Sequence, residues 1–554
     1  MSFDSEKLKE KIEEILYAYV GIQSDTGTAS ERNVEEFFQK WFETVPYFKE
    51  NPEHRGLFKI PNDHLDRHVP WALLKGYGTE TVVLLHHSDT VDAEDYMTLR
   101  DVSLKPRELM KAMKEGKIFM PDDAKADLES GEWIFGRGVM DMKGGAAIHL
   151  AIMEEYTKRT GFKGNLLLLS VPDEENLSAG AIGAVYLLNE LKDKFGLDYK
   201  LCLLSEPDSI TRSLKNGSVG KIMPLIYVRG KLAHVGSVYD GLNSIKILAK
   251  IIDYLDLNPE FIETNGTTTI PAPTFLYAKD QKKVYDVSLP MAASGFISLF
   301  CFNRTPKELM ELMRENCEKA MSDAIEAVKY SFAEFSQKSN DAKKAFDFRV
   351  NVKLYSELYA EAIKDSGDEF ISEIKKVESE VGQKVKSAQM TLLEASHVII
   401  ERTLEFVRDL SPVVVITLVP PYYPYVSNEK LMAKGEFIEK ISDELMKYAK
   451  EKDGYDYTKL FVTGMCDFSY MMQTDDKASN EYIENNMMMW DNGYHIPFEK
   501  IRQISMPILN VGPLGKGIHQ YTERVYKNDL FYTIPNYTDF VIKKVLENGF
   551  NNGK

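Results

Sequence analysis

The stretch NLLLLSVPDEEN, residues 165–176, carries the pattern from which we predict the fold. Its apolar part, residues 165–171, is short and continuous, as expected for a β-strand that is buried on both faces. The strand then ends in three adjacent acids, Asp173, Glu174 and Glu175. Three carboxylates in such a place are costly in free energy unless cations neutralise them, although a solvated loop is the simpler alternative. The stretch therefore predicts a buried strand whose carboxylates serve a metal ion, one as a ligand and a neighbour as a base.

Two further apolar runs, residues 81–85 and 200–204, end in polar side chains in the same way. His87 and Asp89 follow the first run, and Glu206 follows the second. Side chains two residues apart in an extended chain point the same way, so Asp89 can orient the imidazole of His87. Because ligands bind at the carboxyl ends of strands in open α/β sheets, we expect these side chains to meet the acidic triplet.

Two loops supply the remaining candidates. Asp141 lies in GRGVMDMKGG, where it can cap the following helix or expose both oxygens, as a metal-bridging carboxylate requires. His519 lies in the glycine-rich loop GPLGKGIHQ, shortly after a strand candidate at residues 507–511. Imidazole nitrogens and carboxylate oxygens suit zinc, and manganese or cobalt can occupy the same kind of site. Asp208 stays open as an alternative ligand to Glu206.

The domain organisation follows from changes of pattern along the chain. Strand-like and helix-like segments alternate over the first two hundred residues, which favours an α/β layer domain. A second sheet is predicted from runs at residues 222–228, 295–302 and 413–419, and residues 308–407 have the composition of several long helices. We therefore predict a catalytic domain in two parts, residues 1–216 and 455–554, with a second domain at residues 217–454 and a helical insertion at about 308–407.

Composition and charge narrow the class of protein. The chain of 554 residues is 44% hydrophobic and 28% charged, as in ordinary globular proteins. Its net charge of −17 argues against nucleic acid or an anionic membrane as a partner. The scattered cysteines form no CxxC pair, the first twenty residues resemble a charged helix and no signal peptide, and no run of eighteen apolar residues occurs. These features predict a cytoplasmic protein.

The motifs together resemble those of the zinc aminoacylase/carboxypeptidase superfamily, which includes acetylornithine deacetylase, succinyl-diaminopimelate desuccinylase, aminoacylase and peptidase T-like enzymes. The matching motifs, which extend from residue 84 to residue 525, are HHSDTV, GRGVMDMKGG, PDEEN, SEPD and GPLGKGIHQYTERV. A narrower likeness, to RocB-like arginine-utilisation proteins, rests on IPNDHLDRHVPWALLKG, VDAEDY, VPPYYP, GMCDFSYM and HIPFEKI. The resemblance implies a catalytic domain with a central mixed sheet flanked by helices, interrupted by an α+β lid domain that carries the helical insertion.

The resemblance also implies a pair of zinc ions. Asp141 would bridge the two ions. The other ligands would be His87 and Glu206 for one ion, and Glu175 and His519 for the other.

Further roles are implied around this metal pair. Glu174 would be the general base and Asp89 would orient a metal-ligating histidine. In the second domain, His234 would stabilise the oxyanion of the tetrahedral intermediate, and Arg304 would grip a substrate carboxylate, although Asn303 stands where many relatives have Asp. The methionine run NMMMW, residues 486–490, is interpreted as core or as the lining of a cleft.

The predicted function is hydrolysis of an amide bond in a small N-acyl amino acid or a short peptide, by a zinc-bound water with a glutamate base. Arginine or other amino-acid catabolism is the expected setting. Two alternatives stay open: a dipeptidase or carboxypeptidase of the same superfamily, and a catalytically inactive metal-binding sensor or scaffold. The expected assembly is a homodimer, whose lid histidine serves the partner's site, or a monomer whose enlarged lid mimics a partner.

Overall fold

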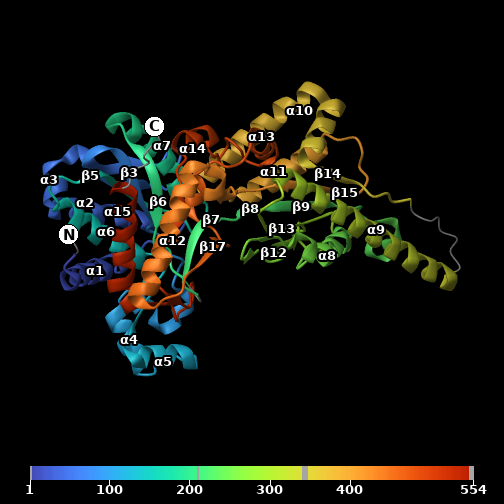
Figure 1. The fold of residues 1–554 in the computed structure, drawn as a ribbon. Helices are drawn as coiled ribbons and strands as arrows, with labels where there is room; N and C mark the ends of the chain where they lie inside the picture. Colours follow the sequence, from blue (N-terminus) through green and yellow to red (C-terminus); the bar gives the residue numbers. More distant parts are fainter. Residues whose placement is uncertain (1–2, 209–210, 340–346, 548–554) are drawn as a thin grey trace. The chain divides into compact units, whose positions relative to one another are not determined.

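The computed structural model describes residues 3–208, 211–339 and 347–547, and these form two compact units (Figure 1). The first unit combines three segments of the chain, Met1–Ser218, Pro424–Thr474 and Ile496–Lys554. The second unit consists of Val219–Tyr423 and Asp475–His495. The first unit is therefore built from both ends of the sequence, with the second unit contributed by its middle.

Within the described ranges, nine strands form the mixed sheet of the first unit. In spatial order they are β1 (Arg55–Lys59), β2 (His68–Lys75), β5 (Lys163–Val171), β3 (Tyr77–His87), β6 (Asp198–Leu204), β18 (Ile508–Asn510), β7 (Ser213–Ser218) and β16 (Val426–Ser427), with β17 (Thr458–Val462) also paired to β7. The central strands β5, β3, β6 and β18 run parallel to one another. Their apolar runs are those predicted from the sequence, so the expectation of a central mixed sheet is confirmed.

Helices cover both faces of this sheet, which explains why its central strands are apolar without alternation. One layer contains α1 (Ser5–Val20), α6 (Lys143–Thr157), α12 (Ala433–Asp453) and α15 (Ile534–Glu547), whose buried residues share a core with alternate residues of β3, β5 and β6. On the strands β1, β2 and β5 packs α7 (Ala179–Phe195). The start of α6 lies very close to the end of β6: a Cβ at Gly145 would stand 2.2 Å from the Ser205 carbonyl oxygen. Only glycine therefore fits at that point, which brings the Asp141 loop next to the strand end.

The structural division differs from the expected boundaries in two places. Residues 424–454, expected in the second domain, belong to the first unit, because the apolar face of α12 joins the core beneath the mixed sheet of that unit. Residues 475–495, expected in the first, belong to the second unit, where the Met488 amide donates to the Leu418 carbonyl oxygen at 2.9 Å. A helix's hydrophobic face does not reveal which of two cores it will cover, so the sequence pattern could not decide either case.

The second unit has its own sheet, of six strands in the part of it that the structure describes. The order is β12 (Thr274–Asp280), β13 (Ala292–Cys301), β9 (Pro224–Arg229), β15 (Val413–Leu418) and β14 (Val352–Leu354), with β8 (Gly220–Ile222) beside β13. Its helices are α8 (Ser244–Leu255), α9 (Pro306–Lys338), α10 (Tyr355–Lys386), α11 (Leu392–Glu405) and α13 (Lys477–Asn486). The long helices α9, α10 and α11 occupy the predicted helical stretch, and among the residues described there the short β14 is the only strand (Figure 1).

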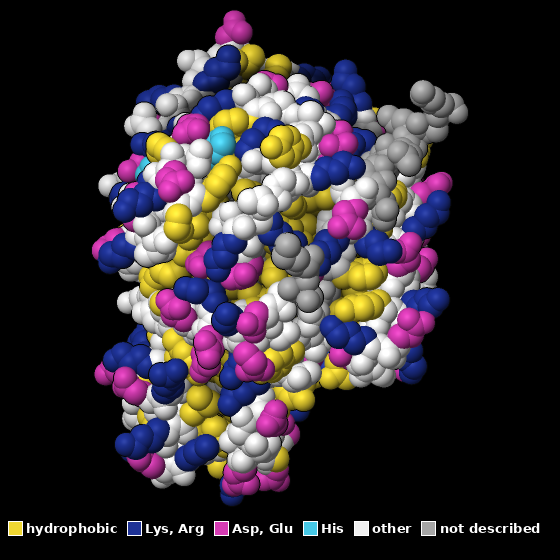
Figure 2. All heavy atoms as spheres, turned by 60° about the vertical axis from the view of Figure 1, so that its left-hand side comes forward, with side chains coloured by type: hydrophobic (Ala, Val, Ile, Leu, Met, Phe, Trp, Pro, Cys, Tyr) yellow, Lys and Arg dark blue, Asp and Glu magenta, His cyan; other side chains and the backbone are white. Residues whose placement is uncertain are grey.

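The surface carries both signs of charge. Figure 2 shows basic and acidic side chains interspersed with apolar ones over the visible face, so the net charge of −17 is not gathered there into one acidic field. Among the described helices, none combines the length and the apolar composition that crossing a membrane requires.

Candidate metal centre

Three parallel strands of the first unit's mixed sheet end at the same edge, and polar residues lie at the end of each. β3 lies between β5 and β6, and its register pairs His87 with Val171 of β5 and Leu84 with Leu203 of β6. The residues that follow these strands therefore leave the sheet side by side. This arrangement brings the predicted ligands His87, Glu175 and Glu206 to one place, as the strand pattern in the sequence indicated.

The described residues contain three groups of side chains whose ligand atoms lie within 4.8 Å of one another. One is His87, Asp141 and Glu206; another is Asp141, Glu175 and His519; the third is His87, Glu174 and Glu175. The first two groups share Asp141 and together contain every predicted ligand. Each group offers one imidazole and two carboxylates, the nitrogen and oxygen donors that zinc binds.

Asp141 lies between the two groups and uses a different oxygen for each. Its Oδ1 is 2.9 Å from His87 Nε2, and its Oδ2 is 3.3 Å from His519 Nε2. The same Nε2 atom of each imidazole also lies near a second carboxylate, Glu206 Oε1 at 3.5 Å from His87 and Glu175 Oε1 at 2.8 Å from His519. A carboxylate in this position can bridge two metal ions, one on each oxygen.

The electrostatics of the cluster also fit a pair of cations. Burial raises the pKa of Glu174 and of Glu206 well above the usual glutamate value. Burial disfavours the charged form of His87, but Glu206 and Asp141 outweigh it and raise its pKa well above normal. Hydrogen bonds to Asp141 and Glu175 raise the pKa of His519 to about 10. The raised pKa values favour the protonated, positively charged forms of His87 and His519, which lie next to the buried acids. Bound metal ions would replace these protons and supply the positive charge instead.

His87 is held with one nitrogen free for a metal. Its Nδ1 donates to the backbone carbonyl oxygen of Asp89 at 3.0 Å, which leaves Nε2 directed at the other ligands. The Asp89 carboxylate is farther from the ring, at 3.7 Å, and it accepts the backbone amides of Glu174 and Glu175, each at 3.1 Å. Asp89 therefore fixes both the histidine and the acidic turn. Sequence spacing predicted that the Asp89 carboxylate would orient the ring, whereas the ring's hydrogen bond is to the Asp89 backbone carbonyl oxygen.

Glu174, the predicted base, lies beside one member of each group that shares Asp141. Its carboxylate groups with His87 and Glu175, and the side chain is 6% exposed. It is absent from the two groups that share Asp141. Glu174 therefore lies next to both of these groups without belonging to either. Such a carboxylate is available to accept a proton.

Of the two candidate metal ligands Glu206 and Asp208, the geometry favours Glu206. Asp208 accepts hydrogen bonds from the Ser213 amide at 2.8 Å and from the Ser213 hydroxyl at 2.6 Å, and it also pairs with Lys215. Its carboxylate is thus occupied in linking β7 to the loop after β6. Glu206, in contrast, faces His87.

The loop that carries Asp141 is fixed from the far end of the chain. Glu523 Oε1 accepts the backbone amides of Met140 at 3.1 Å and Asp141 at 3.4 Å. Its other oxygen accepts from Arg137 Nη1 at 2.8 Å. The side chains of Glu523, Arg137 and Asp141 are all nearly inaccessible to solvent. Asp141, the most exposed of them, is 8% exposed. The bridging carboxylate is therefore held by a contact between residues almost four hundred positions apart.

Arg67 is a site residue that sequence analysis did not identify. Its Nη1 donates to Asp173 Oδ1 at 2.8 Å and to Glu31 Oε1 at 2.7 Å, and its Nη2 donates to Asp63 at 2.6 Å. Asp173 has a φ of 72°, in the left-handed region, at the turn that presents the acidic triplet. The arginine therefore clamps the turn that positions the metal ligands. In the sequence it appeared only within the segment similar to RocB-like proteins, with no spacing to suggest a role.

Asp467 is a second such residue. It is 1% exposed, and in the described part of the chain neither carboxylate oxygen has a hydrogen-bond partner of good geometry, although Ser178 lies close enough to favour the ionised form. Burial raises its pKa to about 8, against the attraction of His87. The GMCDFSYM segment that contains it was recognised only by resemblance. Near neutral pH this raised pKa favours the neutral carboxyl, and the interaction with His87 places Asp467 close to the candidate metal centre.

His234 and Arg304 belong to the second unit. His234 is exposed, and its Nδ1 accepts the Gly236 amide at 3.0 Å. Arg304 donates to the Glu260 carbonyl oxygen at 2.7 Å. Their predicted roles at the metal centre, oxyanion stabilisation and substrate binding, stay predictions.

Comparisons with known proteins identify the family of the chain. The sequence pattern described as Peptidase family M20/M25/M40 matches residues 120–509. The chain is 30% identical to the protein YqjN of Bacillus subtilis, over 99% of this chain and 98% of that protein. It is 29% identical to Protein RocB of the same organism, over 95% of this chain and 93% of RocB. Succinyl-diaminopimelate desuccinylase of Zymomonas mobilis is 37% identical over 22% of this chain and 32% of that enzyme.

Solved structures show the same fold. The aminopeptidase PepT from Bacillus cereus superimposes with a TM-score of 0.52 at 13% identity, covering 97% of this chain and 98% of that one. A tripeptidase from Staphylococcus aureus gives a TM-score of 0.51, also at 13% identity, with coverage of 97% and 98%. At these identities the likeness concerns the fold alone.

Proposed function

Because this chain belongs to Peptidase family M20/M25/M40 and is therefore a hydrolytic, metal-binding enzyme, we propose that it hydrolyses the amide bond of a small N-acyl amino acid or short peptide. The observation that carries the proposal is the position of Asp141 between two groups of nitrogen and oxygen donors, with Glu174 beside them. A scaffold that only bound metal would not need a buried carboxylate placed beside both half-sites.

The metal ions are proposed to be two zinc ions, with manganese or cobalt as substitutes. His87 and Glu206 would hold one, Glu175 and His519 the other, and Asp141 both. When bound, such a pair supplies Lewis acidity, which polarises an amide carbonyl and lowers the pKa of water. The donor set supports zinc because imidazole nitrogens and carboxylate oxygens are among its usual protein ligands, and the same donors also suit manganese or cobalt.

The protein's own groups would manage the proton. Glu174 takes a proton from the water that attacks the amide carbon, and returns it to the nitrogen as the carbon–nitrogen bond breaks. Asp89 holds the Glu174 amide, so the base keeps its position relative to His87. His234 is proposed to donate to the carbonyl oxygen as it gains charge, and Arg304 to bind a substrate carboxylate.

The class of substrate is proposed from the relatives. The similarity to RocB over nearly the whole chain supports a role in the catabolism of arginine or another amino acid, and the partial similarity to desuccinylases supports an acylated amino acid. The cytoplasm is the proposed location, since all four cysteines are buried free thiols.

A hydrolysis screen tests the proposal. The zinc-loaded protein is assayed against N-acyl amino acids and unblocked dipeptides, and faster turnover of the acylated compounds is expected. Glu174→Gln should retain two metal ions per chain by elemental analysis and lose about 100- to 10,000-fold in turnover, the usual contribution of a positioned base. The control is Glu190→Gln, an exposed position on α7, which should leave turnover unchanged. Near-normal activity of Glu174→Gln would refute the assigned role.

A further inference from the structure

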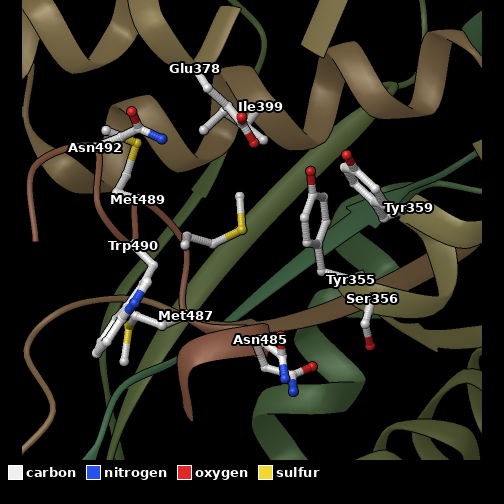
Figure 3. A pocket seen from close by; sticks show the side chains of 12 residues that line it. Tyr355, Ser356, Tyr359, Glu378, Ile399, Asn485, Met487, Met489, Trp490 and Asn492 are labelled. Atoms are coloured by element: carbon white, nitrogen blue, oxygen red, sulfur yellow. The ribbon is translucent and has the colours of Figure 1, made fainter. Parts of the chain in front are cut away.

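The second unit contains a cavity of about 440 Å³ whose lining includes none of the predicted metal ligands (Figure 3). Three parts of the chain line it: α10, α11, and the end of α13 together with the loop that follows, which contains the methionines of the methionine run. All of its lining residues belong to the second unit, whereas every predicted metal ligand belongs to the first. A volume of this size suits a small organic molecule.

Aromatic and sulfur-containing side chains form the walls. Tyr355 and Tyr359 lie one helical turn apart on α10, so both rings face the cavity, with their centroids 6.1 Å apart. Met488 and Met489 close the cavity from the loop after α13, and each is 4% exposed. The faces of aromatic rings attract cations, and methionine adapts to the shape of an apolar group.

Glu378 supplies the charge. Among the lining residues, all of them in the described ranges, it is the only one with a formal charge. It is partly buried, and the described residues give its carboxylate no ion pair or hydrogen bond. Burial raises its pKa against the opposing effect of Lys375, and it also raises the pKa of the neighbouring Tyr355 phenol. Figure 3 shows the hydroxyl ends of both tyrosines pointing towards the end of the cavity where Glu378 lies.

An unpaired carboxylate in partly apolar surroundings is unfavourable until a cation reaches it. An anionic ligand would be repelled by Glu378, and a neutral apolar ligand would leave the carboxylate unpaired. A cation without an apolar body would leave the tyrosine and methionine walls in contact with water. The combination of one negative group with aromatic and thioether walls selects a molecule that has both features.

We propose that this cavity binds an organic amine cation with an apolar body, its ammonium group on Glu378 and its body between the tyrosine rings and the methionines. The helical insertion and the methionine run contribute no predicted metal ligand. In this proposal they form the walls of a second binding site.

Calorimetric titration of the full-length protein with 2-phenylethylamine tests the proposal. Saturable binding is expected for this amine, at least tenfold tighter than for the neutral isostere 2-phenylethanol, and none is expected for the anion 3-phenylpropionate. Glu378→Gln should weaken binding of the amine about ten- to a hundredfold, the range for losing a charge-assisted hydrogen bond. The matched control is Glu380→Gln, an exposed position on the same helix, which should bind as the wild type does.

Thermal denaturation checks that the variant is folded. Because Glu378→Gln removes an unpaired, partly buried charge, its melting temperature should equal or exceed that of the wild type. Tyr359→Leu, which removes one aromatic wall, should also weaken binding of the amine. The proposal is overturned if the amine shows no saturable binding, if 2-phenylethanol binds as tightly, or if Glu378→Gln binds the amine with unchanged affinity.

Discussion

Replacement of Arg67 by methionine should loosen the turn that carries the metal-binding acids. The guanidinium donates to Glu31, Asp63 and Asp173, and all four side chains are at most 2% exposed. Removing one member of a buried ion pair costs about 3–5 kcal/mol, because the partner's charge is left buried and unpaired. Burial already raises the pKa of Glu31 to about 9, so this carboxyl favours its neutral form near neutral pH and adds little unpaired charge when the arginine is lost. We therefore expect a loss near the lower end, about 3 kcal/mol.

The conservative variant Arg67→Lys separates charge from geometry. An ammonium group keeps the positive charge, but it cannot reach three carboxylates as the planar fork does. We expect it to cost about 1.5 kcal/mol, the value of one charge-assisted hydrogen bond. Both variants should also bind zinc about 10- to 100-fold more weakly, as is usual when a group that orients metal ligands is lost.

Urea unfolding measures the stability change, followed by intrinsic fluorescence. Three of the four tryptophans, Trp41, Trp71 and Trp133, belong to the first unit, so the signal reports mainly on that unit. Isothermal titration with zinc gives the metal affinity. The control is Arg100→Met on an exposed side chain, expected to change stability by at most about 0.5 kcal/mol. If Arg67→Met unfolds at the same urea concentration as this control and binds zinc equally well, the clamp has no such role.

Three further outcomes are expected. Burial lowers the pKa of His397 to about 4 from 6.5, so the unfolded chain binds more protons than the folded chain between these values. The free energy of unfolding of the second unit should therefore fall by up to about 3 kcal/mol as pH drops from 6.5 to 4. Urea titrations across this range should show the loss, and His397→Met should remove the part that His397 causes. Glu206→Gln should lower zinc stoichiometry to about one per chain by elemental analysis while Asp208→Asn keeps two, and the opposite result would identify Asp208 as the ligand. Gly145→Ala should cost about 1–3 kcal/mol in urea unfolding, because the added methyl group meets the Ser205 carbonyl oxygen, and an unchanged midpoint would contradict the close packing of α6 on the end of β6.

The residues on the central strands were predictable for a simple physical reason. Strands buried on both faces must be continuously apolar, so the point at which polarity returns, as at His87 and Glu175, marks the edge of the sheet. Parallel neighbours share that edge, which is why ligands from separate strands could be expected together. Asp141 and His519 lie on loops, and their recognition depended on their motifs.

The residues that support the site could not be found in this way. Arg67 reaches Glu31 and Asp173 across 36 and 106 positions, and no local pattern encodes contacts between distant loops. Asp467 looks like an ordinary polar residue until the fold excludes water from it. The same limitation applies to α12, whose apolar face matches either core, so that only tertiary packing decides the unit to which it belongs.

The assembly of the catalytic sheet from both ends of the chain has a consequence for its synthesis. β18 pairs with β6, and His519 follows β18, so the sheet lacks a strand and the candidate metal centre lacks a predicted ligand until residues 508–519 have left the ribosome. Between the emergence of Glu206 and of His519, translation at about 5–20 residues per second takes roughly 15–60 s. During that interval the apolar edge of β6 stays open while the whole second unit is being made. Metal binding at the proposed site would therefore follow the synthesis of the second unit, and until then the open edge of β6 is exposed to pairing with a strand of another copy.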